Sequence, residues 1–249
     1  MTMEAGRTHP IVQAPLVQAR GTLARARAIS HPENRRRLRL LIEVGLIFLV
    51  APILIRYAVF TWRIPLPLVL QPVLIGFIAY LLWDPTFKLR SELTTGFSLR
   101  ALLSIVGIFA AVGTAIVVWV MFEIPHRFME LPTRMPGLWL AIMLFYPLAS
   151  VIPQELIYRT FFFHRYGPLF GDERWLAILV NGLLFGFAHV IFGSYVSIVL
   201  TALLGFLVAW RYDETRSFWA VWLEHTLYGC LVFTIGLGHY FFTGIASLR

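Results

Sequence analysis

The sequence predicts an all-α protein, a polytopic transmembrane helix bundle of about seven to eight spans. Of its 249 residues, 59% are hydrophobic and only 14% are charged, and the mean hydropathy is +0.76. Soluble domains carry about 25% charged residues, so this chain has too few to cover a soluble surface. Apolar runs recur along most of the chain, which favours one membrane domain over a soluble domain with an anchor.

The first 39 residues differ from the rest. They are polar and arginine-rich, and we predict a disordered cytoplasmic tail over 1–39, followed by a single transmembrane domain over 40–249. No short apolar segment with a small-residue cleavage site stands near the start, so we expect no cleaved signal peptide. Cys230 is the only cysteine, which excludes a disulfide within the chain and a cysteine-based metal cluster.

Seven apolar runs make up the predicted spans. The fourth contains Pro147 and Pro153, which are expected to bend it or to divide it into two pieces. Polar or proline-containing segments separate the runs, and 211–217 is assigned to one of these loops. The runs cover residues 40–60, 66–83, 101–122, 137–163, 175–192, 195–210 and 218–242.

The net charge of +8 bears on orientation and on lipid. With the N-terminus in the cytoplasm, 15 of the 21 Lys and Arg residues fall on the cytoplasmic side and 5 on the other, and Arg159 is left inside a span. Cytoplasmic loops are enriched in Lys and Arg, so we predict a bacterial inner (plasma) membrane protein with a cytoplasmic N-terminus. The basic tail favours anionic lipid as a partner; no nucleic acid partner is predicted.

The stretch Pro153–Arg159 places a carboxylate and a guanidinium inside a very apolar part of the chain. Glu155 and Arg159 are four residues apart, so on a helix they share a face and can form an ion pair. Ionisable groups at membrane depth are costly, and they usually mark a functional site. A purely structural ion pair that fixes the packing of the bundle is the alternative.

Two later runs each carry a histidine, His189 and His225. Asn181 and His189 fall along one helical stripe. Together with Glu155, the two imidazoles are sufficient to activate water for peptide hydrolysis, or to bind a divalent metal such as zinc through Glu155, His189 and His225. The sequence has no H-E-x-x-H and no G-x-S-x-G motif, so it supports neither a zincin-like nor a rhomboid-like serine protease.

The order of these motifs resembles the CPBP family of intramembrane proteases, the CAAX prenyl protease and bacteriocin-processing proteins, also called Abi. That family carries E-E-x-x-x-R, F-x-x-x-H and H-x-x-x-N on separate transmembrane helices. The resemblance extends over about residues 137–235, and 204–219 resembles the segment that leads into the last histidine. The matching motifs are Gln154-Glu155-x-x-x-Arg159, Phe185-x-x-x-His189 and His225-x-x-x-Gly229.

The resemblance implies catalytic roles for four residues. Glu155 matches the second glutamate of the family motif, and Arg159 matches the arginine that pairs with it. His189 matches the histidine that works with the carboxylate on the water or the metal. His225 matches the histidine assigned to the oxyanion side or to metal binding.

Two positions depart from the family pattern. Gln154 stands where the family has the glutamate that activates water, and glutamine is not a general base. Gly229 stands where the family has asparagine, so that hydrogen-bond donor is missing. Either Glu155 takes over as the base and another donor such as Asn181 or Tyr228 replaces the asparagine, or proteolysis has been lost.

Three functional hypotheses follow. The first is an intramembrane endopeptidase that cuts a membrane-associated protein or peptide, prenylated or not, and the resemblance implies a metalloendopeptidase. The second is a proteolytically silent member that binds membrane peptides or membrane proteins. The third is a small transporter or proton relay, against which the lack of an internal repeat counts. The expected partners are membrane lipid and a peptide or membrane-protein substrate, and the sequence sets no oligomeric state.

Overall fold

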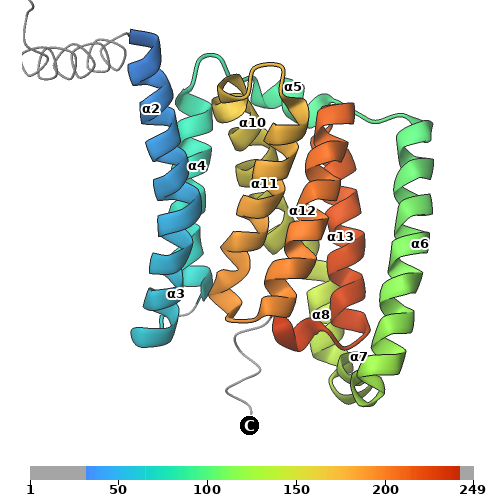
Figure 1. Cartoon of the computed structure of the whole chain (residues 1–249). Helices are drawn as coiled ribbons and strands as arrows, with labels where there is room; N and C mark the ends of the chain where they lie inside the picture. The colour runs from blue at the N-terminus through green and yellow to red at the C-terminus, as the bar shows by residue number, and fades with distance from the viewer. Residues whose placement is uncertain (1–31, 65, 242–249) are drawn as a thin grey trace, which may run out of the picture. The chain divides into compact units, whose positions relative to one another are not determined.

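The computed structural model describes residues 32–64 and 66–241 (Figure 1). Within these ranges all regular elements are helical and no strand occurs, which confirms the all-α prediction. Contacts divide the chain into two units, Met1–Val44 and Gly45–Arg249. The described part of the first unit lies in α2 (Pro32–Gly45), which begins inside the segment assigned to the tail. The rest of that predicted tail, 1–31, lies outside the described residues.

Each of the seven predicted apolar runs is helical over most of its length. Among the described residues, five helices are long and apolar enough to cross a membrane. They are Glu33–Thr61, Leu99–Glu123, Pro136–Leu169, Arg174–Phe192 and Tyr195–Thr215. Two further helices, α4 (Leu66–Trp83) and α13 (Phe218–Thr234), have 18 and 17 residues. The chain is therefore an integral membrane protein built as a polytopic helical bundle.

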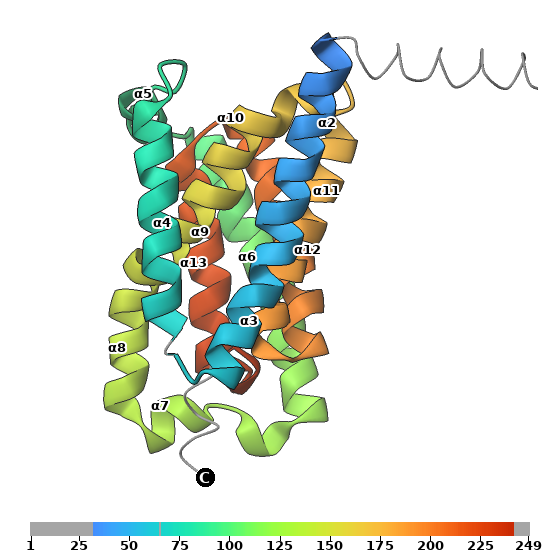
Figure 2. The same cartoon turned by 90° about the vertical axis from the view of Figure 1, so that its left-hand side faces the viewer.

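The second unit consists of helices joined by short connections. Figure 2 shows α9 and α13 side by side in its middle, and contacts between residues of the two helices support this. Apart from α4 and α13, its helices are α3 (Ala51–Thr61), α5 (Leu89–Thr94), α6 (Leu99–Glu123), α7 (Glu130–Arg134), α8 (Pro136–Tyr146), α9 (Ile152–Glu155), α10 (Phe162–Tyr166), α11 (Arg174–Ala188) and α12 (Tyr195–Thr215). Its π-helical segments are η2 (Leu46–Val50), η4 (Pro147–Val151) and η5 (Leu156–Phe161).

The second unit is apolar outside and partly polar inside. Large apolar side chains such as Trp83 and Phe122 are more than four-fifths exposed (87% and 82%), as expected for a surface that faces lipid. The interior instead contains charged and polar groups, among them Glu155, Arg159 and His225. In a membrane such groups are tolerated when they face one another within the bundle, so these residues are where a site is expected.

Local sequence explains how α12 and α13 begin and how α11 packs against α12. Ser194 and Ser217 cap the N-termini of α12 and α13, their hydroxyls accepting bonds from backbone N–H groups three residues on. Gly182 and Gly186 form a G-x-x-x-G pair on α11, and a Cβ at Gly186 would lie 2.5 Å from the Cβ of Ala202. Small residues at this spacing let α11 and α12 approach closely, which fixes the position of the α11 C-terminus.

The sixth span is longer than predicted, because Arg211 lies within α12 and not in a loop. Its side chain is buried and forms a two-pronged ion pair with Glu224 of α13, with Nε–Oε2 and Nη2–Oε1 distances of 2.9 and 3.1 Å. Its Nη1 and Nη2 atoms also donate to the Ser104 hydroxyl, each at 3.2 Å. The assignment of Arg211 to a polar loop was therefore wrong, since a partner inside the bundle satisfies its charge.

Three connections predicted to lie on one side of the membrane contact one another. Tyr212 donates a 2.7 Å hydrogen bond to Glu92 of α5, and the Ser217 hydroxyl donates to the carbonyl of Thr95 at 2.9 Å. His164 lies 3.1 Å from the Asp84 carboxylate. The Thr86 hydroxyl and amide donate to Asp84 and lower its pKa to about 2, so this carboxylate stays ionised at any cellular pH.

Candidate active site

The helix that carries Glu155 is continuous over Pro136–Leu169, but two wide turns interrupt its α-helical winding. These turns, η4 and η5, stand on either side of α9. Pro147 opens the first, where its missing N–H removes a helical hydrogen bond. Such π-helical turns are frequent at functional sites. The two prolines thus change the winding of one helix and do not divide it into two pieces.

A chain of hydrogen bonds links Glu155, His225 and Tyr146. The Oε1 atom of Glu155 lies 2.7 Å from Nδ1 of His225, and Nε2 of the same ring lies 3.1 Å from the Tyr146 hydroxyl. Glu155 is fully buried, and His225 is 2% exposed. A carboxylate only accepts, so in the neutral ring Nδ1 carries the proton and donates to Glu155. Nε2 is then the acceptor, and the Tyr146 hydroxyl donates to it.

Arg159 completes the pairing of Glu155, as the i, i+4 spacing predicts. Its Nε lies 3.3 Å from Oε2 of Glu155, and both side chains are fully buried. Its Nη1 donates to the Asn181 side-chain oxygen at 2.7 Å, and the Asn181 amide donates to the carbonyl of Tyr158 at 2.6 Å. The guanidinium also lies over the Phe185 ring, 4.8 Å from its centroid. The carboxylate is therefore held from two sides, by His225 and by Arg159.

His189 stands at the C-terminal end of α11, beside the same cluster. Its Nδ1 lies 2.8 Å from the Phe185 carbonyl, which can only accept, so Nδ1 carries the proton and Nε2 is the acceptor in the neutral ring. The Phe185 ring lies edge-on to both imidazoles, 4.9 Å from His189 and 5.5 Å from His225 between centroids. The Phe185 ring therefore contacts both of the histidines that were predicted as site residues.

A largely apolar cavity of about 1240 Å³ adjoins these groups. His189, His225 and Tyr146 line it, whereas Glu155 and Arg159 do not. Gln154 lines it too: its amide nitrogen donates to the Ser150 hydroxyl at 2.8 Å, and its Oε1 has no hydrogen-bond partner among the described residues. The histidines face the cavity, and the ion pair lies behind His225.

Comparison with known proteins supports the family suggested by the motifs. Residues 135–231 match the model of the Rce1-like family, described as type II CAAX prenyl endopeptidase, Rce1-like. This part of the chain is similar to that family. Searches of the curated proteins and of the solved structures gave no match. The matched region contains the four catalytic candidates, Glu155, Arg159, His189 and His225.

The predicted metal ligands are not brought together as a set. Within 32–64 and 66–241, no three His, Cys, Asp or Glu side chains gather so that they could hold a metal ion. Oε1 of Glu155 and both ring nitrogens of His225 are hydrogen-bonded, and Oε2 of Glu155 is ion-paired with Arg159. The arrangement does not fit zinc bound by Glu155, His189 and His225, and we derive no step through a metal.

Three residues of the candidate site were not predicted from the sequence. Tyr146 reaches His225 across 79 positions of sequence, and nothing in the apolar run around it distinguishes it. Ser150 lies four residues before Gln154, and this spacing could have identified it. Arg56 of α3 is the third, because its Nη1 donates to the carbonyls of Val190 and Ile191 at 3.1 and 3.3 Å.

We expect Arg56 to position the turn that carries His189. Arg56→Met removes both bonds to this turn and is expected to lower kcat about tenfold in any peptide cleavage that uses His189, because small displacements of a group that takes part in a reaction are costly. Arg56→Lys keeps a donor and should recover part of the loss. Equal kcat in wild type and Arg56→Met, measured on the same peptide in detergent, would contradict this positioning role.

Proposed function

We propose that this protein is an intramembrane endopeptidase that hydrolyses a peptide bond of a membrane-associated protein or peptide. The observation that carries the proposal is the placement of His225 at the cavity wall, with Glu155 on Nδ1 and Tyr146 on Nε2, within the region that matches CAAX endopeptidases. A carboxylate behind an imidazole that faces a cavity is an arrangement that supports general-base catalysis.

In this mechanism His225 is the general base. Its Nε2 takes a proton from a water molecule as the water oxygen attacks the substrate carbonyl, and Glu155 stabilises the imidazolium that forms. The imidazolium then gives this proton to the leaving amine as the C–N bond breaks. Arg159 orients Glu155, and Glu155 does not line the cavity, so the carboxylate acts through His225 and does not meet the water.

His189 and Gln154 are proposed to hold the attacking water. Each presents an acceptor atom, Nε2 of His189 and Oε1 of Gln154, on residues that line the cavity. One water hydrogen is bound by one of these acceptors and the other points to Nε2 of His225, which together aim the oxygen lone pair at the substrate carbonyl. This role needs no carboxylate at position 154, so glutamine there is compatible with hydrolysis.

The cavity lining supports an amphiphilic substrate. Its walls are largely aliphatic and aromatic, with the polar groups gathered at the histidines. A peptide segment close to the membrane surface, with or without a lipid chain, fits this character. We place the protein in a bacterial inner membrane with its N-terminus in the cytoplasm, where the basic residues of α2 would meet anionic lipid.

A proteolytically silent role as a membrane peptide- or protein-binding factor is the second candidate. The observation that favours it is the replacement of two polar family positions, by Gln154 and Gly229. Under this hypothesis the cavity binds a peptide without cleaving it. Substitution of Glu155 by glutamine would then leave any cellular phenotype unchanged.

Cleavage of quenched peptides by detergent-solubilised protein tests the proposal. We expect the wild type to cleave, and His189→Ala to lower kcat by at least about 10²-fold, in the range of lost general acid–base assistance. His164→Ala is the matched control, since His164 contacts Asp84 in a connecting segment. A chelator added to each sample tests the metal prediction. Folded wild type that cleaves neither soluble nor lipidated peptides would favour the silent role.

A further inference from the structure

Position 229 faces the ring of Tyr146 at very short range. A Cβ built on Gly229 would lie 2.3 Å from both Cε1 and the hydroxyl oxygen of Tyr146. No real side chain tolerates such contacts, so while Tyr146 keeps this position only glycine fits at 229. The tyrosine ring in this position therefore requires that residue 229 has no side chain.

Tyr146 supplies a hydrogen-bond donor next to Gly229, which has no side chain to donate from. Tyr146 is the last residue of α8, and its hydroxyl reaches Nε2 of His225 at 3.1 Å, on the cavity wall. Its ring packs edge-on against Phe233, with centroids 5.5 Å apart, one turn beyond Gly229 on α13. The hydroxyl is therefore aimed at the nitrogen that the proposed mechanism uses as base.

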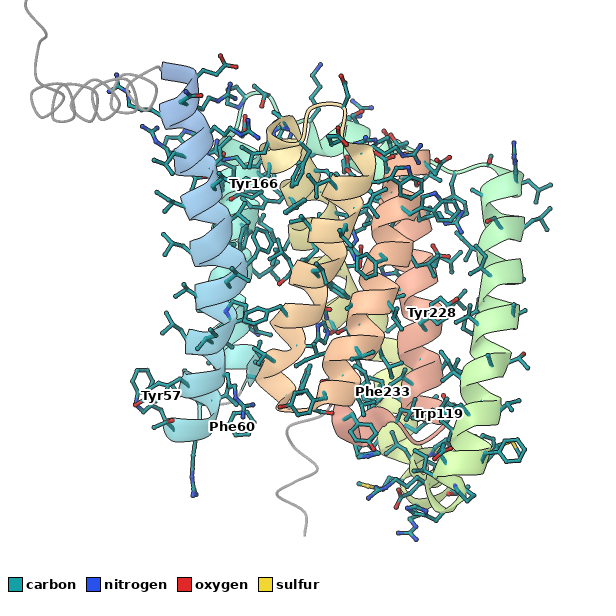
Figure 3. The ribbon with its side chains drawn as sticks, viewed as in Figure 1. Tyr57, Phe60, Trp119, Tyr166, Tyr228 and Phe233 are labelled. Carbon is teal, nitrogen blue, oxygen red and sulfur yellow. The ribbon has the colours of Figure 1, made fainter. Side chains whose placement is uncertain are left out.

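The two donors suggested by the sequence are not aimed at this nitrogen. Asn181 is buried and engaged by Arg159 and by the carbonyl of Tyr158. Tyr228 packs edge-on against Phe109 of α6, with centroids 5.2 Å apart, and points toward that helix (Figure 3). Among the described side chains, Tyr146 is the one recorded in a hydrogen bond with His225 Nε2.

We propose that the Tyr146 hydroxyl is the oxyanion donor of this site, and that Gly229 is the small residue that makes room for it. The inference rests on the proposed endopeptidase function. In the resting site the hydroxyl donates to His225 Nε2. When a substrate carbonyl enters, the same O–H turns to the carbonyl oxygen, and Nε2 is released to accept the proton of the attacking water.

This exchange keeps every proton accounted for. The hydroxyl proton of Tyr146 stays on its oxygen and donates first to nitrogen and then to the negative oxygen of the tetrahedral intermediate. The water proton moves to His225 and then to the leaving amine. The neutral imidazole of His225 is therefore a base that Tyr146 blocks until a substrate binds, which limits water activation in the empty cavity.

Removal of the hydroxyl is the first test. Tyr146→Phe is expected to lower kcat by about 10²–10³-fold with KM changed less than about threefold, because the bond to the oxyanion forms only as the reaction proceeds. Tyr212→Phe is the matched control: it also removes one hydroxyl hydrogen bond, to Glu92, away from the cavity, and should leave kcat unchanged. Wild-type kcat in Tyr146→Phe would overturn the inference.

Exchange of the two positions is the second test. Gly229→Asn alone should be inactive, since the new side chain collides with Tyr146. Tyr146→Ala opens the space but lacks the donor. The double variant Tyr146→Ala/Gly229→Asn supplies an amide donor from position 229 and should exceed Tyr146→Ala in kcat by at least about tenfold. No gain in a folded double variant would contradict the coupling of the two positions.

The outcomes separate this inference from the function on which it rests. A wild type that cleaves, with Tyr146→Phe equally active, rejects the tyrosine and keeps the endopeptidase. A folded wild type that cleaves nothing rejects the endopeptidase and the donor role together. Nitrogen NMR of labelled histidine then reports the resting bond alone, as a shift of the His225 Nε2 signal between wild type and Tyr146→Phe.

Discussion

Substitution of Glu155 by glutamine is expected to lower kcat by about 10³–10⁴-fold, the loss expected when the carboxylate behind a catalytic imidazole becomes an amide. The carboxylate accepts the Nδ1 proton of His225 at 2.7 Å and so leaves Nε2 free to act as a base. An amide can donate to Nδ1 instead, which moves the ring proton to Nε2 and removes the base. The buried imidazolium also loses the negative charge that stabilises it.

The measurement is kcat of Glu155→Gln on a cleaved peptide, with thermal unfolding recorded in the same detergent. Glu224→Gln is the matched control, because it weakens another fully buried ion pair, to Arg211, without touching the His225 ring contacts. Both variants should lose stability, and only Glu155→Gln should lose most of its activity. Similar activity in the two variants would count against the role of Glu155.

The sequence was sufficient to predict the helices and the paired charges. Long apolar runs can only be satisfied as helices in lipid, so their positions followed from hydropathy. Glu155 and Arg159 could be paired in advance because the i, i+4 spacing is a property of the helix itself. The roles of His189 and His225 stay predictions, but both residues do lie on one cavity.

Interactions between helices that are distant in the sequence could not be predicted from the sequence. Tyr146 sits among apolar residues, and only the three-dimensional arrangement of α8 and α13 brings it to His225. Arg211 was assigned to a loop because an isolated charge lowers local hydropathy, and Glu224, which neutralises it, lies 13 residues later on the next helix. In both cases the decisive partner is on another helix, where local patterns carry no information.

Removal of Arg159 should have the largest effect on stability. Arg159→Met leaves the Glu155 carboxylate, which is fully buried, without the guanidinium 3.3 Å away, and also leaves the Asn181 oxygen without its donor. Breaking a buried ion pair on one side costs about 3–5 kcal/mol, since an uncompensated charge stays inside the protein. We therefore expect a loss of this size in the free energy of unfolding, measured in mixed detergent micelles.

The double variant Glu155→Met/Arg159→Met separates the cost of an unpaired charge from the value of the pair. With both charges replaced by apolar side chains, most of the stability should return, because the desolvation penalty of two buried ions is removed as well. Activity should not return, since His225 has lost its carboxylate. A double variant less stable than Arg159→Met would mean that the ion pair itself holds the bundle together. Recovery of stability without activity would mean that the protein keeps this pair for its chemistry.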